Sequence, residues 1–281
     1  MSILAFHKNI QTMILVPVDF SLTSINAAKY ACQWAIQLGF TKLHLYHSYI
    51  ADDGVSEIGI EGVAAKAKQA LIELKQQLES IANCPELTIE TNQEPVLAYL
   101  NQLVKSHQAY NIVMGLSGKG KLAQKVIGST TTKVAQEAHC PVIIVPPDSA
   151  FQSVKNIVLA LPFQKDRIEK TPANLISNMV LKTGAQLMVL QVNNGLAGVA
   201  QEVNSDLQTA HHLFPDIEAR FYTEEGKQVP KEVLEFAIEQ SAEMIIAIIH
   251  QHGFWHKLLK GDTTEEIVFN SKVPIFAARS L

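Results

Sequence analysis

The sequence is poor in the groups that commit a chain to redox, metal or nucleic-acid chemistry. Cysteine occurs only three times in 281 residues, at Cys32, Cys84 and Cys140, and no two of them form a CxxC pair. This spacing predicts neither a disulfide framework nor a zinc cluster, and it favours a reducing, cytoplasmic setting. Charged residues make up 18% of the chain, and its net charge is −4. The chain therefore lacks the broad positive field with which nucleic-acid binders neutralise phosphates, and we expect no nucleic-acid partner.

Long apolar runs are also missing. The longest, Met244–Ile249, falls far short of the roughly 20 residues that span a bilayer. The opening residues MSILAFHKNIQT lack a basic stretch followed by a long apolar one, so they do not predict a signal peptide. We therefore expect no membrane partner. Hydrophobic residues still make up 47% of the chain, and its length predicts two domains of about 150 residues each.

The order of the predicted elements is repeated along the chain. Short apolar runs predict five strands in the first half, at 13–18, 43–49, 87–91, 110–114 and 142–145. Matching runs predict five more in the second half, at 157–161, 187–192, 217–222, 244–249 and 275–278. Helical periodicity fills the connections, most clearly at 24–38, 64–82, 171–183 and 199–213, with Thr171 as the expected N-cap of the third. Alternation of five strands with four helices in each half predicts a parallel sheet covered on both faces.

The spacing within the two halves supports their equivalence. Pro141 and Pro274 lie 133 residues apart, and so do Gly128 and Gly261. We therefore predict an α/β protein with two tandem doubly wound, Rossmann-like domains, residues 1–147 and 152–281, each built on a five-stranded parallel sheet. The segment Pro146–Ser149 is a short, stiff connector between them.

A glycine-rich loop follows the fourth predicted strand of the first half. It runs Gly115-Leu-Ser-Gly-Lys-Gly-Lys121, and Gly128-Ser-Thr-Thr131 then opens the next helix. Glycines let a backbone approach a pyrophosphate closely, and the N–H groups at a helix start donate to anions. Parallel sheets bind ligands beyond the carboxyl ends of their strands. The loop therefore predicts a phosphate site, with Lys119 or Lys121 near the phosphates and Asp19, after the first strand, near ribose hydroxyls.

These residues resemble the universal stress protein family over the whole chain, as a tandem pair. Gly115, Gly118 and Gly128-Ser129 match the family's ATP-binding signature, a glycine, two residues, a glycine, nine residues, a glycine and Ser or Thr. Asp19 matches its acid at the end of the first strand, and Cys140-Pro141-Val142 matches the turn into its last strand. The resemblance implies ATP as the ligand, with a divalent ion such as Mg²⁺ held mainly by the phosphates.

The resemblance also implies which residues contact each part of the nucleotide. The adenine pocket would be lined by Pro17, Val18, Ser48 and Met114, and Asp19 would hold the sugar. The phosphates would lie against Gly115, Gly118, Gly128, Ser129 and Thr130, with Lys119 beside them.

Most of these residues are replaced in the second half. Asp19 corresponds to Pro162, Gly115 to Ile248, Gly118 to Gln251 and Ser129 to Asp262, while Gly128 keeps its glycine as Gly261. Side chains obstruct backbone approach, and a carboxylate at a helix start repels phosphate. We therefore predict a degenerate second domain and a single nucleotide site.

A histidine cluster replaces the glycine loop in that half. His250, His252 and His256 invite a zinc or copper interpretation, because imidazoles at this spacing can converge in a loop. No acid or cysteine completes a recognisable ligand set, so the sequence favours structural histidines and leaves the metal as the minority alternative.

The sequence thus predicts an ATP-binding regulatory or sensing protein rather than an enzyme. A weak ATP hydrolase or phosphotransferase is the alternative, opposed by the lack of a recognisable general base near the loop. A nucleotide-free interaction scaffold is the third. The family pattern further implies an intramolecular pseudo-dimer in which the last strands, 142–145 and 275–278, pair edge to edge, hiding both edges. A homodimer of the whole chain is left open.

Overall fold

The computed structural model describes residues 13–49, 57–116, 127–162, 165–193, 209–210, 212–249 and 272–281. The strands are β1 (Met13–Pro17), β2 (Lys42–Ser48), β3 (Glu86–Asn92), β4 (Asn111–Gly115), β5 (Val142–Val145), β6 (Asn156–Leu161), β7 (Gln186–Asn193), β8 (Ala219–Glu225), β9 (Met244–Ile249) and β10 (Ile275–Arg279). The helices are α1 (Leu22–Leu38), α2 (Glu57–Glu79), α3 (Val96–His107), α4 (Ser129–Glu137), α5 (Lys165–Ile168), α6 (Ala173–Thr183) and α8 (Val229–Glu239).

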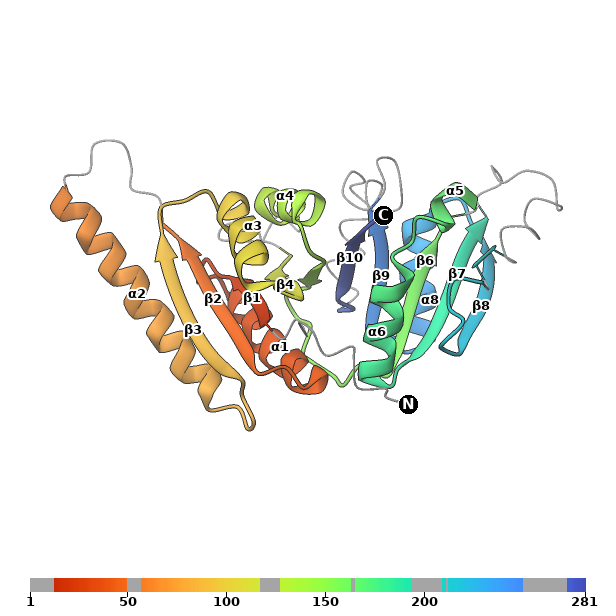
Figure 1. The fold of residues 1–281 in the computed structure, drawn as a ribbon, viewed down its shortest axis with the longest axis horizontal. Helices are drawn as coiled ribbons and strands as arrows, with labels where there is room; N and C mark the ends of the chain where they lie inside the picture. Colours follow the sequence, from red (N-terminus) through yellow and green to blue (C-terminus); the bar gives the residue numbers. More distant parts are fainter. Residues whose placement is uncertain are drawn as a thin grey trace, which may run out of the picture.

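The strands form one sheet that is composed of two similar halves (Figure 1). Their order is β3-β2-β1-β4-β5 in the N-terminal half and β10-β9-β6-β7-β8 in the C-terminal half. Pairing is parallel within each half, and only the central pair, β5 with β10, is antiparallel. The predicted α/β class with a parallel-dominated sheet is confirmed. The domain boundaries at 147 and 152 stay a prediction.

Helices cover both faces of this sheet and enclose two apolar clusters. One cluster packs under α1, α2 and α6, and it includes Trp34, Leu71 and Met179. The other packs under α3, α4 and α8, with Leu100, Val134 and Leu234 among its members. Each cluster draws residues from both halves of the chain, so the two halves bury their apolar surface together.

Strand register supports the equivalence that the sequence spacing indicated. Ile14 of β1 pairs with Asn111 of β4, and Ile157 of β6 pairs with Met244 of β9. Asn111 and Met244 are 133 residues apart, which is the offset found in the sequence. Gly115 and Ile248, four residues further along β4 and β9, therefore occupy corresponding positions.

The central pairing is itself symmetric about one residue pair. Phe276 of β10 lies opposite Ile143 of β5, and these two residues correspond at the offset of 133. In the flanking pairs, Ile275 lies opposite Ile144 and Ala277 lies opposite Val142. At the same offset Ile275 corresponds to Val142 and Ala277 to Ile144, so the two pairs are related by the symmetry. The predicted pairing of the last strands of the two halves is thus present in the sheet.

Residues 154–156, where the chain enters β6, are held by both halves. Gln37 of α1 donates to the Val154 carbonyl and accepts from the Val154 N–H, at 2.9 Å in each case. From the C-terminal half, Glu243 Oε2 accepts from the N–H groups of Lys155 and Asn156, at 3.0 and 2.7 Å. Buried backbone groups need such partners, and here side chains of both halves supply them.

Three local expectations were wrong. The second helix spans 57–79 rather than 64–82, because Gly59 and Gly62 in its first turns are typical of a loop. The strand expected at 217–222 lies at 219–225. It is an edge strand, and its last residues, Thr223-Glu-Glu225, are polar, so a search for apolar runs did not include them. Thr171 does not cap the following helix: Pro172 holds the N-cap position, and the buried Thr171 hydroxyl has no hydrogen-bond partner among the described residues.

One expected helix lies largely outside the described residues, since only 209–210 and 212–213 of the stretch 199–213 are described. Within the described residues, none of the helices has the length and apolar character needed to cross a bilayer.

Candidate functional site

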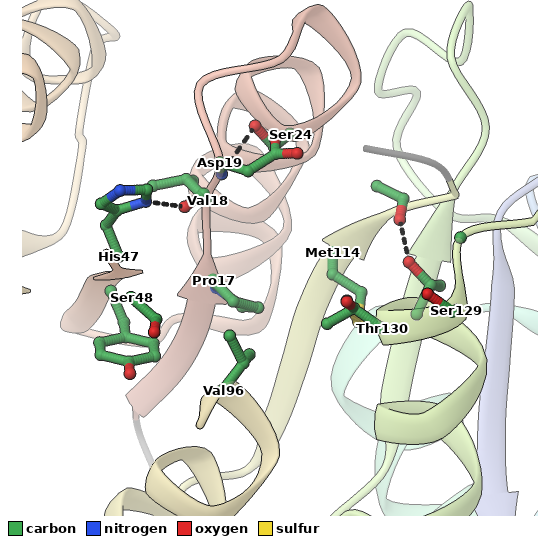
Figure 2. A pocket seen from close by; sticks show the side chains of 14 residues that line it. Pro17, Val18, Asp19, Ser24, His47, Ser48, Val96, Met114, Ser129 and Thr130 are labelled. Atoms are coloured by element: carbon green, nitrogen blue, oxygen red, sulfur yellow. Dashed lines mark hydrogen bonds between the residues drawn. The ribbon is translucent and has the colours of Figure 1, made fainter. Parts of the chain in front are cut away.

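The candidate site is a cavity at the carboxyl ends of the N-terminal strands (Figure 2). In the order β3-β2-β1-β4-β5, strands β2 and β3 lie on one side of β1, and β4 and β5 lie on its other side. The strand order therefore reverses between β1 and β4. Open parallel sheets bind ligands at this point. The cavity has a volume of about 310 Å³ and is lined by Pro17, Val18, Asp19, Ser24, Tyr46, His47, Ser48, Val96, Met114, Gly115, Gly128, Ser129, Thr130 and Thr131.

The fold brings the sequence-predicted residues together from four segments of the chain. Nine of the eleven predicted residues line this one cavity. The other two, Gly118 and Lys119, lie outside the described residues, as does Lys121. The ligand-contacting roles assigned to all eleven stay predictions.

Asp19 is held in place by the first turn of α1. Its Oδ1 accepts from the N–H and the hydroxyl of Ser21, at 3.0 and 2.5 Å. Ser21 in turn caps α1, because its Oγ accepts from the Ser24 N–H at 3.2 Å. The Asp19 N–H donates to Ser24 Oγ at 3.3 Å. These bonds fix the carboxylate at the cavity wall, at the start of the helix that follows β1.

His47 is a lining residue that the sequence analysis did not select. Its Nδ1 lies 2.7 Å from the carbonyl oxygen of Val18. Since a carbonyl can only accept, Nδ1 carries the proton. The imidazole also packs against the Phe20 ring, with the centroids 4.6 Å apart. His47 therefore supports the chain as it leaves β1, next to Asp19.

The wall formed by β2 is fixed by contacts with the β3–α3 loop. The Tyr46 hydroxyl donates to Asn92 Oδ1 at 2.7 Å and to the Glu94 carbonyl at 3.2 Å, and burial raises the pKa of Tyr46 to about 12. The Ser48 hydroxyl also donates to the Glu94 carbonyl, at 2.7 Å. The loop held in this way leads into α3, whose first residue, Val96, lines the cavity.

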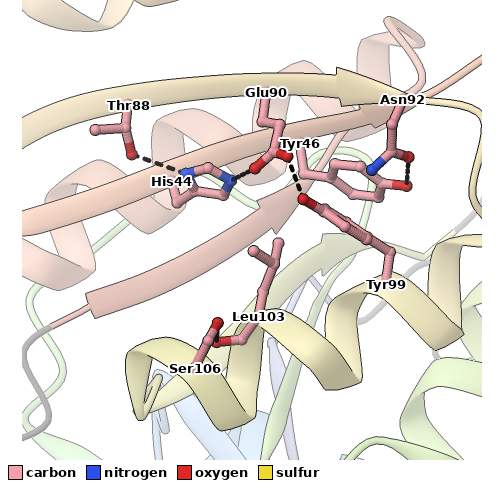
Figure 3. A network of polar contacts seen from close by, with 8 residues as sticks. All are labelled: His44, Tyr46, Thr88, Glu90, Asn92, Tyr99, Leu103 and Ser106. Atoms are coloured by element: carbon pink, nitrogen blue, oxygen red, sulfur yellow. Dashed lines mark hydrogen bonds and ion pairs between the residues drawn. The ribbon is translucent and has the colours of Figure 1, made fainter.

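A polar network continues from this wall along β2 and β3 (Figure 3). His44 Nδ1 lies 2.8 Å from Thr88 Oγ1, and its Nε2 lies 3.4 Å from Glu90 Oε2. The Tyr99 hydroxyl donates to the other Glu90 oxygen. Burial lowers the pKa of His44, against the opposing attraction of Glu90. His44 is therefore held as neutral imidazole at neutral pH.

The opposite wall is the N-terminus of α4. Gly128 is its N-cap and makes no side-chain cap hydrogen bond among the described residues, and Ser129 and Thr130 in the first turn are exposed. The Thr131 hydroxyl donates to the Gly115 carbonyl at 2.9 Å, and the Gly128 N–H donates to the Leu116 carbonyl at 3.0 Å. These bonds tie the helix start to the end of β4, so that its N–H groups and two hydroxyls stand at the cavity, as anion binding requires.

Gly115 has a structural role that the sequence analysis did not foresee. A Cβ at this position would lie 2.9 Å from both the carbonyl carbon and the oxygen of Thr23 in α1. Contacts this short would force the backbone of α1 to move. Gly115 therefore lets α1 begin directly against β4, whether or not a phosphate approaches it.

The C-terminal half differs at the corresponding point. The residue matching Gly115 is Ile248, which is buried in the apolar cluster under α1, α2 and α6. The residue matching Asp19 is Pro162, whose carbonyl accepts from the buried Gln191 side chain at 3.3 Å. Gln251, Gly261, Asp262 and the histidines at 250, 252 and 256 lie outside the described residues.

The sequence comparisons find similarity to one family. A family model described as "Universal stress protein family" matches residues 12–146. A universal stress protein of Methanocaldococcus jannaschii is 27% identical over 153 residues, which cover 51% of this chain and 87% of that one. Matches to mycobacterial universal stress proteins span 47% to 63% of those relatives' own length.

Solved structures extend the likeness of fold to nearly the whole chain. A universal stress protein from Archaeoglobus fulgidus superimposes with a TM-score of 0.68 at 21% identity, covering 95% of this chain and 96% of that one. A universal stress protein solved in complex with cAMP covers 49% of this chain and 98% of its own, at 20% identity and a TM-score of 0.40. Residues 12–146 are thus similar to the universal stress protein family, and the likeness of the remaining chain is one of fold.

Proposed function

We propose that the N-terminal half binds an adenine nucleotide, ATP in the first instance, in the cavity between β1 and β4, and that binding serves a sensing or regulatory role. The observation that carries this proposal is the convergence of Asp19, the end of β4 and the open N-terminus of α4 on one cavity at the switch point. A volume of about 310 Å³ is at the lower end of the range for small-molecule pockets.

The chemistry of the walls fits the three parts of a nucleotide. Pro17, Val18, Val96 and Met114 offer an apolar surface for a purine. Asp19 is placed to accept hydrogen bonds from ribose hydroxyls. The exposed Ser129 and Thr130 hydroxyls and the first N–H groups of α4 are placed to donate to phosphate oxygens, which would themselves hold a divalent ion.

The same residues favour binding over catalysis. Among the described residues that line the cavity, Asp19 is the one carboxylate, and its Oδ1 already accepts two hydrogen bonds from Ser21. Hydrolysis needs a base that can reach the attacking water, and a carboxylate fixed at the sugar end of the cavity is poorly placed for that. We therefore propose a nucleotide-binding protein rather than an enzyme.

The C-terminal half is proposed to act as a degenerate partner domain in an intramolecular pseudo-dimer. The symmetric register of β5 and β10 supports this arrangement, because corresponding residues face each other about the Ile143–Phe276 pair. Both edges are thereby paired. The replacement of Gly115 by Ile248 and of Asp19 by Pro162 supports a single nucleotide site per chain.

The proposal is tested by calorimetric titration of the whole chain with ATP. We expect micromolar affinity, about −8 kcal/mol. The decisive variant is Thr130→Glu: an acid in the first turn of a helix stabilises the helix but repels phosphate. We expect at least a tenfold loss of affinity with an undiminished melting temperature, whereas Thr130→Gln, of the same size and uncharged, keeps most of the affinity.

Three outcomes would contradict the proposal. Absence of ATP binding by the folded wild type would favour a nucleotide-free scaffold. Equal affinity in Thr130→Glu and Thr130→Gln would place the phosphates elsewhere. Rapid steady-state phosphate release that Asp19→Ala abolishes would favour the hydrolase.

A further inference from the structure

Two of the three cysteines meet in the fold, away from the nucleotide cavity. Cys32 lies in α1 and Cys84 in the turn between α2 and β3, 52 residues later, and their Sγ atoms are 3.1 Å apart. Cys32 is fully buried, while Cys84 is half-buried. Neither residue lines the cavity or makes one of the contacts described for the site. Their proximity is therefore a separate feature.

The distance between the sulfurs is short enough for a covalent bond to form with little movement. A disulfide needs about 2.05 Å between them, so a shift of about 1 Å divided between two side chains is sufficient. The surrounding turn is compact: the Cys84 N–H donates to the Ile81 carbonyl at 3.1 Å, and Asn83 adopts a left-handed conformation with φ of 61°.

Small reagents reach this pair from the Cys84 side. A shallow hollow is lined by the end of α2 and the turn that follows it, and Cys84 is one of its lining residues. Cys32, in contrast, is enclosed by the apolar cluster under α1. The two thiols thus differ in access, as expected of a pair in which one sulfur meets the oxidant and the other resolves the product.

We propose that Cys32 and Cys84 are a site of reversible oxidation, in which a hydroperoxide converts the pair into an intramolecular disulfide. In the first step the Cys84 sulfur attacks a peroxide oxygen, the O–O bond breaks, and Cys84 sulfenic acid and water form when the oxidant is hydrogen peroxide. In the second step the Cys32 sulfur attacks the Cys84 sulfur, the S–O bond breaks, and the Cys32 proton leaves with the hydroxyl as water. Two equivalents of a small thiol reverse the reaction by thiol–disulfide exchange.

The third cysteine provides an internal reference. Cys140 packs on the other apolar cluster, across the sheet from Cys32 and Cys84. Burial raises the pKa of its thiol to about 12. Cys140 is therefore not placed to join the pair, and it should remain a thiol when the disulfide forms.

The test is oxidation of the folded chain with hydrogen peroxide, followed by thiol counting after unfolding. We expect the titre to fall from three thiols per chain to one, with a peptide that links Cys32 to Cys84 on mapping, and to return to three with a reductant. Because the new bond closes a loop of about 50 residues, the oxidised chain should melt roughly 5–10 °C above the reduced one.

Matched variants separate the pair from general oxidation. Cys140→Ser should still lose two thiols, while Cys84→Ser should lose thiols at least tenfold more slowly and show no rise in melting temperature. Cys84 is half-buried, so this variant is expected to fold. A disulfide between two chains, a link that involves Cys140, or a Cys84 that stops at sulfinic acid with Cys32 still reduced would overturn the proposal.

Discussion

The two halves share strand order and register, yet they differ where the chain leaves the first strand of each. In the N-terminal half α1 begins at Leu22, five residues after the end of β1, and its first turn packs against Gly115. In the C-terminal half the corresponding long helix, α6, begins only at Ala173, twelve residues after the end of β6, and Ile248 carries a buried side chain. A short helix, α5, comes between β6 and α6, so the long helix directly follows the first strand only in the half that has a glycine at the end of its fourth strand, as far as the described residues show.

This difference shows that a glycine of the signature can be required by packing as well as by ligand binding. One of its glycines, Gly115, is explained by helix packing alone. What distinguishes the N-terminal half as the proposed binding site is Asp19, fixed by Ser21, together with the start of α4, where no side-chain cap hydrogen bond is found among the described residues. A search for a nucleotide site should therefore give more weight to these features than to the first glycine.

The largest expected effect follows from a side chain at that glycine. Gly115→Ala, the smallest step toward the Ile248 of the other half, should lower the free energy of unfolding by about 1–3 kcal/mol, because its Cβ meets the Thr23 backbone. Urea unfolding measures the loss. The matched control is Gly62→Ala, at an exposed position of α2 with no atom within 4 Å of the new Cβ, which should stabilise by about 0.5–1 kcal/mol. Equal effects of the two substitutions would remove the packing explanation.

A second effect concerns residues 154–156 at the start of β6, which side chains of both halves hold. Gln37→Ala leaves the N–H and carbonyl of the buried Val154 without their side-chain partner, so we expect a loss of about 1–3 kcal/mol. Glu243→Gln keeps an oxygen that accepts from Lys155 and Asn156 and should cost less. Urea unfolding of both variants compares the two attachments. A larger loss in Glu243→Gln would mean that the C-terminal half supplies the dominant one.

A third effect tests the acid that only the N-terminal half carries. Asp19→Asn retains an oxygen for Ser21 but removes the charge, so ATP affinity should fall about three- to tenfold, near 1 kcal/mol, with little change in stability. Calorimetric titration and a melting curve give both quantities. The reciprocal variant Pro162→Asp should create no second site. A gain of binding there would show that the other replacements in that half matter little.

The smallest effect is a dependence of stability on pH that only the N-terminal half should show. Strand register places Met188 of β7 where β2 has His44. Because burial lowers the pKa of His44 below its ordinary value of 6.5, the unfolded chain binds the proton more readily. Stability should be complete above about pH 6.5 and fall as the pH is lowered through and below that value.

Replacement of His44 by methionine, the residue at the corresponding position of the C-terminal half, isolates the contribution of His44 to the pH dependence of stability. His44→Met should flatten the fall in unfolding free energy between neutral and mildly acidic pH, as measured by urea titrations at a series of pH values. A profile unchanged by His44→Met would assign the acid sensitivity to other groups.

Much of the fold was predictable from the sequence because buried parallel strands are continuous apolar runs. Met244–Ile249 and Val142–Val145 are fully apolar and were located as they stand in the structure. The strand at Ala219–Glu225 was predicted two to three residues too early, because this edge strand has neither a continuous apolar run nor a regular alternation of polar and apolar residues. The start of the helix Glu57–Glu79 was missed for a different reason, because Gly59 and Gly62 made its first turns resemble a loop.

The site was predictable to the extent that its residues follow strands directly. Asp19 and Gly128 lie where the chain leaves or approaches the sheet, so topology placed them together, whereas Met114 was implied by the family resemblance. Ser24 was predicted as the first residue of its helix but not as a lining residue, and Val96 was missed because no start was predicted for the helix that it begins. The proximity of Cys32 and Cys84 depends on how α1 packs against the turn after α2, and no spacing in the sequence encodes that contact.

The central claim is that one half alone binds the nucleotide, and its stoichiometry is the most direct test. Titration of the whole chain with ATP, combined with photo-crosslinking of an azido-adenine analogue and peptide mapping, should give one equivalent per chain, attached to peptides from the ends of β1, β2 or β4. Two equivalents, or a label on peptides that follow β6 or β9, would contradict the account.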